Sequence, residues 1–186
     1  MNARDTTHFP SAAHAVALIG CGPKPRTPDV PPPEAIGFKA HNLARMAAMG
    51  LPVPPAFVLG TGWCADPAAL RPEVWQPALA ALEHASDARF GDARQPLLLS
   101  VRSGAPVSMP GMMETLLNIG LCDATLPGFL RATGNPRLVW DAYRRLVAGF
   151  GEVVLGIDAA VFEADLAQIA AGRDNLLHVM KRQLGH

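Results

Sequence analysis

The chain has 186 residues, of which 49% are hydrophobic and 17% are charged, and its 16 Lys and Arg residues balance its 16 Asp and Glu residues. A chain of this length and apolar content can form one domain with a sizeable core. Because the net charge is zero, there is no excess of basic residues for a broad nucleic-acid-binding surface, and we expect no nucleic-acid partner. No apolar stretch reaches the ~20 residues needed to cross a membrane, so we expect no membrane partner.

Cysteine and histidine usage argues against a disulfide framework and against a zinc site. The three cysteines, Cys21, Cys64 and Cys122, are far apart and form no C-x-x-C pair. None of the six histidines has H-E-x-x-H spacing. The sequence therefore predicts no metal ligands and favours a reducing, cytoplasmic environment.

Residues 1–36 are expected to hold an N-terminal strand and a proline-rich connector, ahead of a main subdomain at residues 37–186. Ala15–Ile19 favours a short strand that ends at a glycine turn. Leu18–Cys21 also resembles the cleavage box of a bacterial lipoprotein, but acidic, histidine and proline residues interrupt the segment before it, so we favour the strand. The prolines between residues 23 and 33 indicate either a stiff extended connector or a loop wrapped over the domain.

Helices and strands are predicted in turn between residues 42 and 101. Asn42–Met49 predicts a short helix that Gly50 ends, and Ala56–Leu59 predicts a strand. Thr61 is a candidate N-cap for a short helix that carries a tryptophan and a cysteine. Leu97–Val101 lacks polar alternation, which predicts a buried, central strand. A helix between these strands is indicated by the apolar spacing of Val74, Ala78, Leu82 and Ala85.

The C-terminal third is predicted to be rich in helices. A long helix with a wide apolar arc carries Arg144 and Arg145 on its remaining face, and two short helices follow at Val161–Ala170 and Asn175–Leu184. Few strands followed by many helices indicate an α+β or mixed α/β fold. The wide arc of the long helix consists of two stripes, one of Leu138, Ala142, Leu146 and Phe150 and the other of Trp140, Tyr143 and Val147.

The segment from Leu97 to Thr115 carries the strongest chemical signal. An apolar run ends at Arg102 and opens into a loop of Ser, Gly, Pro and Met residues. A guanidinium group binds phosphate oxygens in bidentate fashion, and small residues let backbone N–H groups approach the same oxygens. The pattern therefore predicts an anion site; the alternative is a buried strand that ends in an incidental exposed arginine.

Two stretches of this segment resemble pyruvate, phosphate dikinases. Ser100–Ala105 reads Ser-Val-Arg-Ser-Gly-Ala, and Ser108–Thr115 reads Ser-Met-Pro-Gly-Met-Met-Glu-Thr. Both are similar to the nucleotide-binding N-terminal domain of that family, which has aspartate where this chain has Glu114. The resemblance continues in Gly37–Phe57 and Tyr143–Ile157.

The resemblance, which runs from about Gly37 to Phe162, implies the first part of an ATP-grasp-type nucleotide-binding domain, in which ATP lies between two subdomains. It implies that Lys39 and Arg102 contact the nucleotide phosphates, with Arg102 as the catalytic candidate. It also implies that Met109, Gly111 and Thr115 belong to the loop that closes over the terminal phosphates. Independently, a lysine just before a helix N-terminus strengthens a phosphate site, although the spacing of Lys39 alone favours a solvated lysine and only the resemblance favours a phosphate ligand.

The chain departs from the family pattern around this lysine. Phe38 and Ala40 replace two glycines, and their side chains could obstruct a close approach of the backbone to phosphate. His41 is also new, and we expect an exposed helix histidine rather than a catalytic one. Arg144 and Arg145 could reach a phosphate or an acidic partner, but a solvated helix face is the favoured interpretation.

The resemblance implies the ATP-binding portion of a phosphotransferase. The complete family enzyme converts ATP, pyruvate and phosphate into AMP, phosphoenolpyruvate and diphosphate, and Mg²⁺ is expected as its cofactor. No segment of this chain matches the family's metal ligands, phosphohistidine domain or pyruvate-binding barrel, so we expect this chain not to complete catalysis alone. It either works with separately encoded dikinase domains as partners or is a truncated product. The alternatives are a stand-alone nucleotide- or phosphate-binding module without turnover, and an interaction protein that has lost the ligand.

Overall fold

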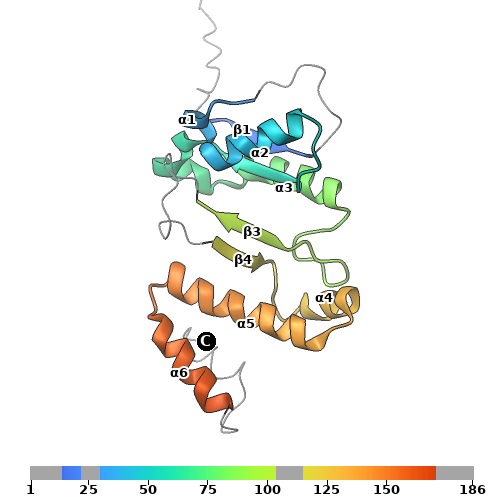
Figure 1. Cartoon of the computed structure of the whole chain (residues 1–186), viewed down its shortest axis with the longest axis vertical. Coiled ribbons are helices and arrows are strands. Elements are labelled where there is room, and N and C mark those ends of the chain that lie inside the picture. The colour runs from blue at the N-terminus through green and yellow to red at the C-terminus, as the bar shows by residue number, and fades with distance from the viewer. Residues whose placement is uncertain (1–13, 22–29, 104–114, 171–186) are drawn as a thin grey trace, which may run out of the picture. The chain divides into compact units, whose positions relative to one another are not determined.

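A computed structural model describes residues 14–21, 30–103 and 115–170 of the chain. These residues form a mixed α/β structure with six α-helices, two short 3-10 helices and two antiparallel sheets of two strands each (Figure 1). The predicted mixed α/β class is thereby confirmed. The described residues divide into two compact units, one that extends to Asp87 and one formed by Ala88–Ser103 and residues 115–170.

The sheet of the first unit joins β1 (Val16–Ile19) to β2 (Ala56–Leu59). The strands are antiparallel, with Val16 opposite Leu59 and Ile19 opposite Ala56. Both strands were predicted from the sequence and are confirmed. Pro52, Pro54 and Pro55 force an extended backbone that leads directly into β2.

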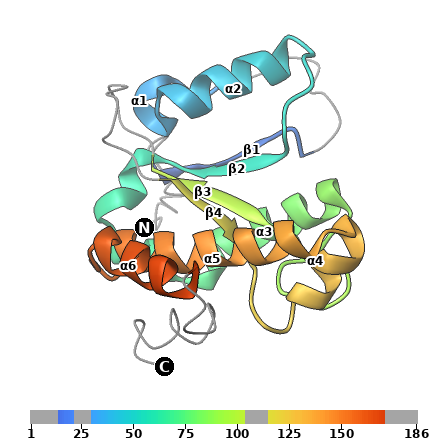
Figure 2. The ribbon, with the colours of Figure 1, turned by 60° about the horizontal axis from the view of Figure 1, so that its bottom comes forward.

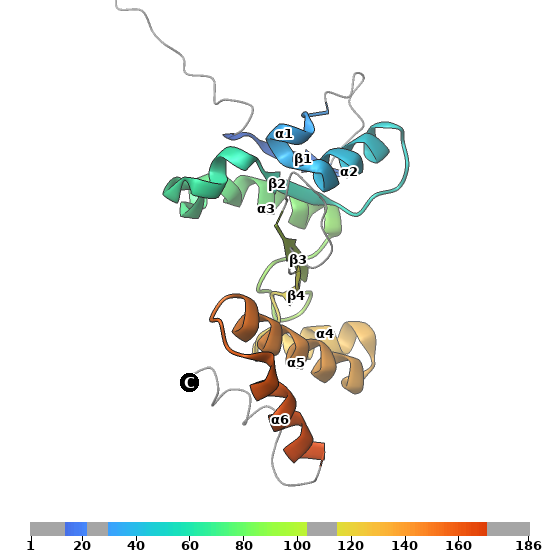
Figure 3. The same cartoon turned by 60° about the vertical axis from the view of Figure 1, so that its left-hand side comes forward.

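Helices cover both faces of this small sheet. The helix α2 (Phe38–Ala48) contacts β1, and α3 (Pro72–Ser86) contacts both strands from the other side (Figure 2 and Figure 3). A four-residue helix, α1 (Pro33–Ile36), packs against α2 and begins with a proline, which suits the first helical position. The buried apolar residues of this unit include Ile19, Ala35, Ile36, Ala78 and Leu82.

The helix α2 differs from the prediction at its N-terminal end only. The helix begins four residues before Asn42, because its first turn carries no apolar periodicity that the sequence could reveal. Its end is as predicted: Gly50 adopts a left-handed φ of 85°, and the Leu51 N–H donates to the Met46 carbonyl at 3.0 Å.

Two 3-10 helices, η2 (Thr61–Ala65) and η3 (Pro67–Leu70), connect β2 to α3. The short helix expected after Thr61 is thus present, but Gly60 is its N-cap residue and Thr61 does not cap it. The Thr61 hydroxyl instead donates to the Glu34 carbonyl at 2.8 Å and ties η2 to α1.

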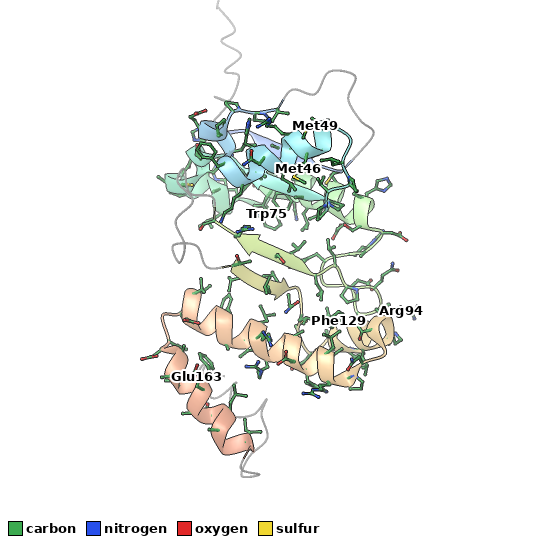
Figure 4. The ribbon with its side chains drawn as sticks, in the orientation of Figure 1. Met46, Met49, Trp75, Arg94, Phe129 and Glu163 are labelled. Atoms are coloured by element: carbon green, nitrogen blue, oxygen red, sulfur yellow. The ribbon has the colours of Figure 1, made fainter. Side chains whose placement is uncertain are left out.

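The second unit contains β3 (Leu99–Arg102), β4 (Thr115–Ile119) and the helices α4 (Leu126–Thr133), α5 (Pro136–Val153) and α6 (Ala159–Ala170). The long helix α5 lies along β4, as Figure 1 shows. Phe129, labelled on α4 in Figure 4, packs against the core of this unit. That core consists of Leu121, Leu126, Val139, Ala142, Tyr143, Val147 and Phe162.

The prediction of a buried, central strand at Leu97–Val101 is wrong. Among the described strands, β3 pairs only with β4, and Val101 is 51% exposed. The apolar run is buried before the strand begins, because Leu97 is buried and Leu98 packs against the core cluster. An apolar run of this length cannot show which of its residues reach the core.

The apolar arc of α5 is narrower than the two predicted stripes. Buried positions run along the line of Val139, Tyr143 and Val147, whereas Leu138 and Trp140 at the flanks are each 48% exposed. The predicted helix at Val161–Ala170 is confirmed as α6, and the one at Asn175–Leu184 lies outside the described residues. The sequence did not reveal α4.

Candidate functional site

The structure brings two of the candidate site residues together on the β3–β4 sheet. Arg102, the last residue of β3, is paired with Thr115, the first residue of β4, and both are exposed. Directly paired residues of antiparallel strands project from the same face, with Cβ atoms about 4.5–5.5 Å apart. A guanidinium group and a hydroxyl group therefore lie side by side where β3 ends and β4 begins.

This face of the sheet points away from α5. The preceding pair, Val101 and Leu116, occupies the opposite face because side chains alternate along a strand. Leu116 approaches α5, since its Cδ2 atom lies 3.7 Å from the position that a Cβ on Gly149 would take. Arg102 and Thr115 therefore project toward the side that α5 leaves open.

A β-bulge sets the register that pairs these two residues. Leu99 is opposite Ile119 but Val101 is opposite Leu116, so β4 has one more residue than β3 between the two pairs. Within this bulge Asn118 has a φ of 60°, a region that asparagine tolerates better than most residues. Its Nδ2 donates to the Ala142 carbonyl of α5 at 3.3 Å and so anchors the bulge to the helix.

Lys39 lies in the first unit, as the second residue of α2, and is exposed. The sequence predicted Lys39 just before the helix, but the residue lies inside the first turn. Among the described residues no side chain caps this helix, whose N-terminal N–H groups carry partial positive charge. The preceding residue at the N-cap, Gly37, is buried and has a φ of 81°, which favours glycine.

The residues around Lys39 that depart from the family pattern have distinct environments. Phe38 is 48% exposed, and Ala40 is half-buried. His41 is half-buried, and its Nδ1 atom lies 2.8 Å from the Pro31 carbonyl oxygen. The prediction of an exposed histidine is therefore wrong. Because a carbonyl oxygen can only accept, the ring donates to it through Nδ1.

Arg144 and Arg145 bind an acidic residue of their own helix. Arg144 Nη2 lies 2.9 Å from Asp141 Oδ1, and Arg145 Nε lies 2.7 Å from Asp141 Oδ2. The two guanidinium groups hold the pKa of Asp141 below its ordinary value. The Arg145 side chain is 64% exposed, as a solvated helix face predicts, whereas the Arg144 side chain is only 21% exposed.

The remaining candidates, Met109 and Gly111, lie outside the described residues. Within the described ranges, no group of three or more His, Cys, Asp or Glu residues could hold a metal ion. No helix in the described part of the chain is long and apolar enough to cross a membrane. Sequence reasoning missed the roles of His41 and Asn118, although an asparagine near the end of a strand is itself a signal of left-handed backbone.

No protein-family model matches the chain. Among individual proteins it is similar to a pyruvate, phosphate dikinase of Rhizobium meliloti (strain 1021), with 40% identity over 161 residues, which is 82% of this chain and 17% of that protein. Pyruvate, phosphate dikinase of Clostridium symbiosum is 41% identical over 69% of this chain and 15% of its own length. Pyruvate, phosphate dikinase 2 of Zea mays is 46% identical over 72% of this chain and 16% of its own length. The chain thus spans about a sixth of these relatives.

Proposed function

Because the matched part of this chain belongs to the pyruvate, phosphate dikinase family, we propose that it is the ATP-binding portion of a dikinase-like phosphotransferase. Lys39 and Arg102 are its phosphate ligands, and Met109, Gly111 and Thr115 belong to the loop over the terminal phosphates. The domain is of the ATP-grasp type. The observation that carries the proposal is the pairing of exposed Arg102 with Thr115 at the two ends of this loop.

The chemistry of these groups suits a polyphosphate. Arg102 offers a planar guanidinium group whose N–H donors match two phosphate oxygens, and Thr115 offers a hydroxyl beside it. Lys39 adds a second positive charge next to the uncapped N–H groups of α2, where phosphate is favoured. Positive charge placed at phosphate oxygens stabilises the charge that develops during phosphoryl transfer, which is the catalytic role proposed for Arg102.

We propose that the complete reaction also requires Mg²⁺, pyruvate and phosphate. We assign no described residue to Mg²⁺, because the acidic residues in the described ranges form no ligand cluster. Magnesium would bridge phosphate oxygens and neutralise their charge when bound. The other dikinase segments are the proposed partners in that reaction; the sequence spans 15–17% of its relatives' length.

Calorimetric titration with MgATP tests the proposed phosphate ligands. Lys39→Ala and Arg102→Ala should each weaken binding by about 1.5–3 kcal/mol, the usual contribution of a hydrogen bond to a charged group. Arg45→Ala, at the other end of α2, and Arg94→Ala, an exposed residue of the second unit, are matched controls that should bind like the wild type. Equal affinity in the wild type and in both test variants would reject this site.

A further inference from the structure

Two side-chain hydrogen bonds hold α1 in place within the first unit. The His41 ring, on α2, donates through Nδ1 to the Pro31 carbonyl at 2.8 Å. The Thr61 hydroxyl, in η2, donates to the Glu34 carbonyl of α1 at 2.8 Å. A helix of four residues is not stable by itself, so its orientation depends on such external bonds.

The backbone between α1 and α2 is held by further bonds. The Gly37 N–H donates to the Pro33 carbonyl at 2.7 Å, and the Gly37 carbonyl accepts from the His41 N–H at 3.0 Å. Lys39 lies midway between Gly37 and His41. His41 is therefore bonded on both sides of the junction, by its backbone to Gly37 and by its ring to Pro31.

We infer that His41 is a positioning residue for phosphate binding by Lys39. Its ring bond to Pro31 ties the backbone just ahead of α1 to α2, and so fixes α1 against the first turn of α2. A fixed first turn presents the Lys39 stem and the uncapped N–H groups in one arrangement, so less conformational freedom is lost when an anion binds. This inference rests on the proposed function, and the dikinase pattern has no histidine at this position.

Substitutions that keep or remove the donor atom test the inference. The side-chain amide nitrogen of asparagine can occupy the place of Nδ1, whereas that of glutamine reaches the place of Nε2. His41→Ala and His41→Gln should weaken MgATP binding roughly three- to tenfold, and His41→Asn should restore most of the loss, as expected for one hydrogen bond. His84→Ala, at an exposed position of α3, is the matched control and should change nothing.

Hydrogen exchange of the ligand-free protein supplies a readout that does not depend on nucleotide. The N–H groups of Ala35, Ile36 and Gly37 donate to Pro32 and Pro33 carbonyls. Their exchange should accelerate roughly three- to tenfold in His41→Ala and return toward the wild-type rate in His41→Asn. Thermal melting of each variant identifies any that fails to fold. If His41→Ala does, His41→Asn is compared with His41→Gln, and the inference requires tighter MgATP binding by the asparagine variant.

The outcomes separate the two proposals. Equal MgATP affinity in the wild type and His41→Ala overturns the role of His41 and leaves the proposed function standing. Unchanged exchange at residues 35–37 in His41→Ala also overturns it. A wild-type protein that does not bind MgATP overturns the proposed function and the inference together.

Discussion

Thr125 is the most completely buried polar residue described in this protein, with an exposure of 0%. Its single hydroxyl lies in the turn between β4 and α4 and serves several partners there. It accepts from the Cys122 N–H at 2.8 Å and lies 2.9 Å from the Gly120 carbonyl. The pKa of the exposed Cys122 thiol is lowered chiefly by the same hydroxyl, which lies 3.7 Å from Cys122 Sγ and favours the thiolate.

Thr125→Val keeps the shape of this residue and removes its hydroxyl. The loss should leave the Cys122 N–H unsatisfied, at a cost of about 1–3 kcal/mol in unfolding free energy. The pKa of Cys122 should rise toward its ordinary value, so alkylation of Cys122 by iodoacetamide, followed by peptide mass spectrometry, should require a higher pH.

Because the pKa of the Cys122 thiol is lower in the folded state, the unfolding free energy of the wild type depends on pH. The thiolate stabilises the wild type above the pKa of the unfolded thiol, and this contribution disappears as the pH falls through the lower folded pKa. The difference in unfolding free energy between Thr125→Val and the wild type should therefore be larger at alkaline than at neutral pH. Thr133→Val, which removes a hydroxyl bonded to Phe129 at the other end of α4, is the control for Cys122. An identical alkylation profile in Thr125→Val would contradict the assigned cause.

Among the elements, α4 depends on one close backbone approach. A Cβ at Gly128 would lie 2.6 Å from the Ala93 carbonyl oxygen and 2.9 Å from that of Arg94, whose side chain is labelled beside α4 in Figure 4. Arg131 reinforces the same contact by donating to the Ala93 carbonyl at 3.0 Å. The loop at residues 93–96 thus packs directly on the helix backbone, and only glycine leaves room for it.

Alanine at two helix glycines should therefore have opposite effects. Gly128→Ala should destabilise the second unit by about 1–3 kcal/mol, because the added methyl group overlaps backbone that cannot move freely. Gly149→Ala, in α5, should stabilise it by about 0.5–1 kcal/mol, because alanine is the better helix former and its Cβ meets only Leu116 at 3.7 Å. Urea unfolding curves measure both changes. A stabilising Gly128→Ala would show that the loop does not pack on α4.

The same two helices show what a sequence can and cannot reveal about elements. Periodicity and end signals located β1, β2, α6 and the end of α2, because there the local residues alone decide the structure. They missed α4, because Pro127 and Gly128 both disfavour helix interiors and only the contact with the 93–96 loop explains the glycine. They also placed Leu138 and Trp140 in the core, because spacing identifies a face but not how much of it the neighbouring elements cover.

At the scale of the whole molecule, the two proposed phosphate ligands belong to different units. Sequence spacing could suggest each of Lys39 and Arg102 as a phosphate-binding cation. It did anticipate that an apolar run of the chain ends at Arg102. The pairing of these two residues depends on the bulge at Asn118, which no periodicity predicts.

A double-mutant cycle tests whether both cations act on one nucleotide. If they do, the double variant Lys39→Ala, Arg102→Ala should lose less MgATP binding free energy than the sum of the two single losses. The shortfall should be about 0.5–1.5 kcal/mol, because losing one contact leaves the phosphates less well held for the other. Calorimetry of the four proteins measures this coupling, and Arg45→Ala with Arg102→Ala is the reference pair. Strict additivity would indicate that the two cations act separately.

The extra residue of β4 also changes which positions count as equivalent along that strand. Leu116 and Ile119 are three residues apart, yet they share one side of the sheet, because their partners Val101 and Leu99 are two apart. The odd interval, which on its own would suggest a helix turn, is corrected by the bulge. Loss of a single residue between Leu116 and Ile119 would therefore remove the bulge and preserve the strand's inner and outer sides, whereas loss of two would invert those sides upstream of the gap.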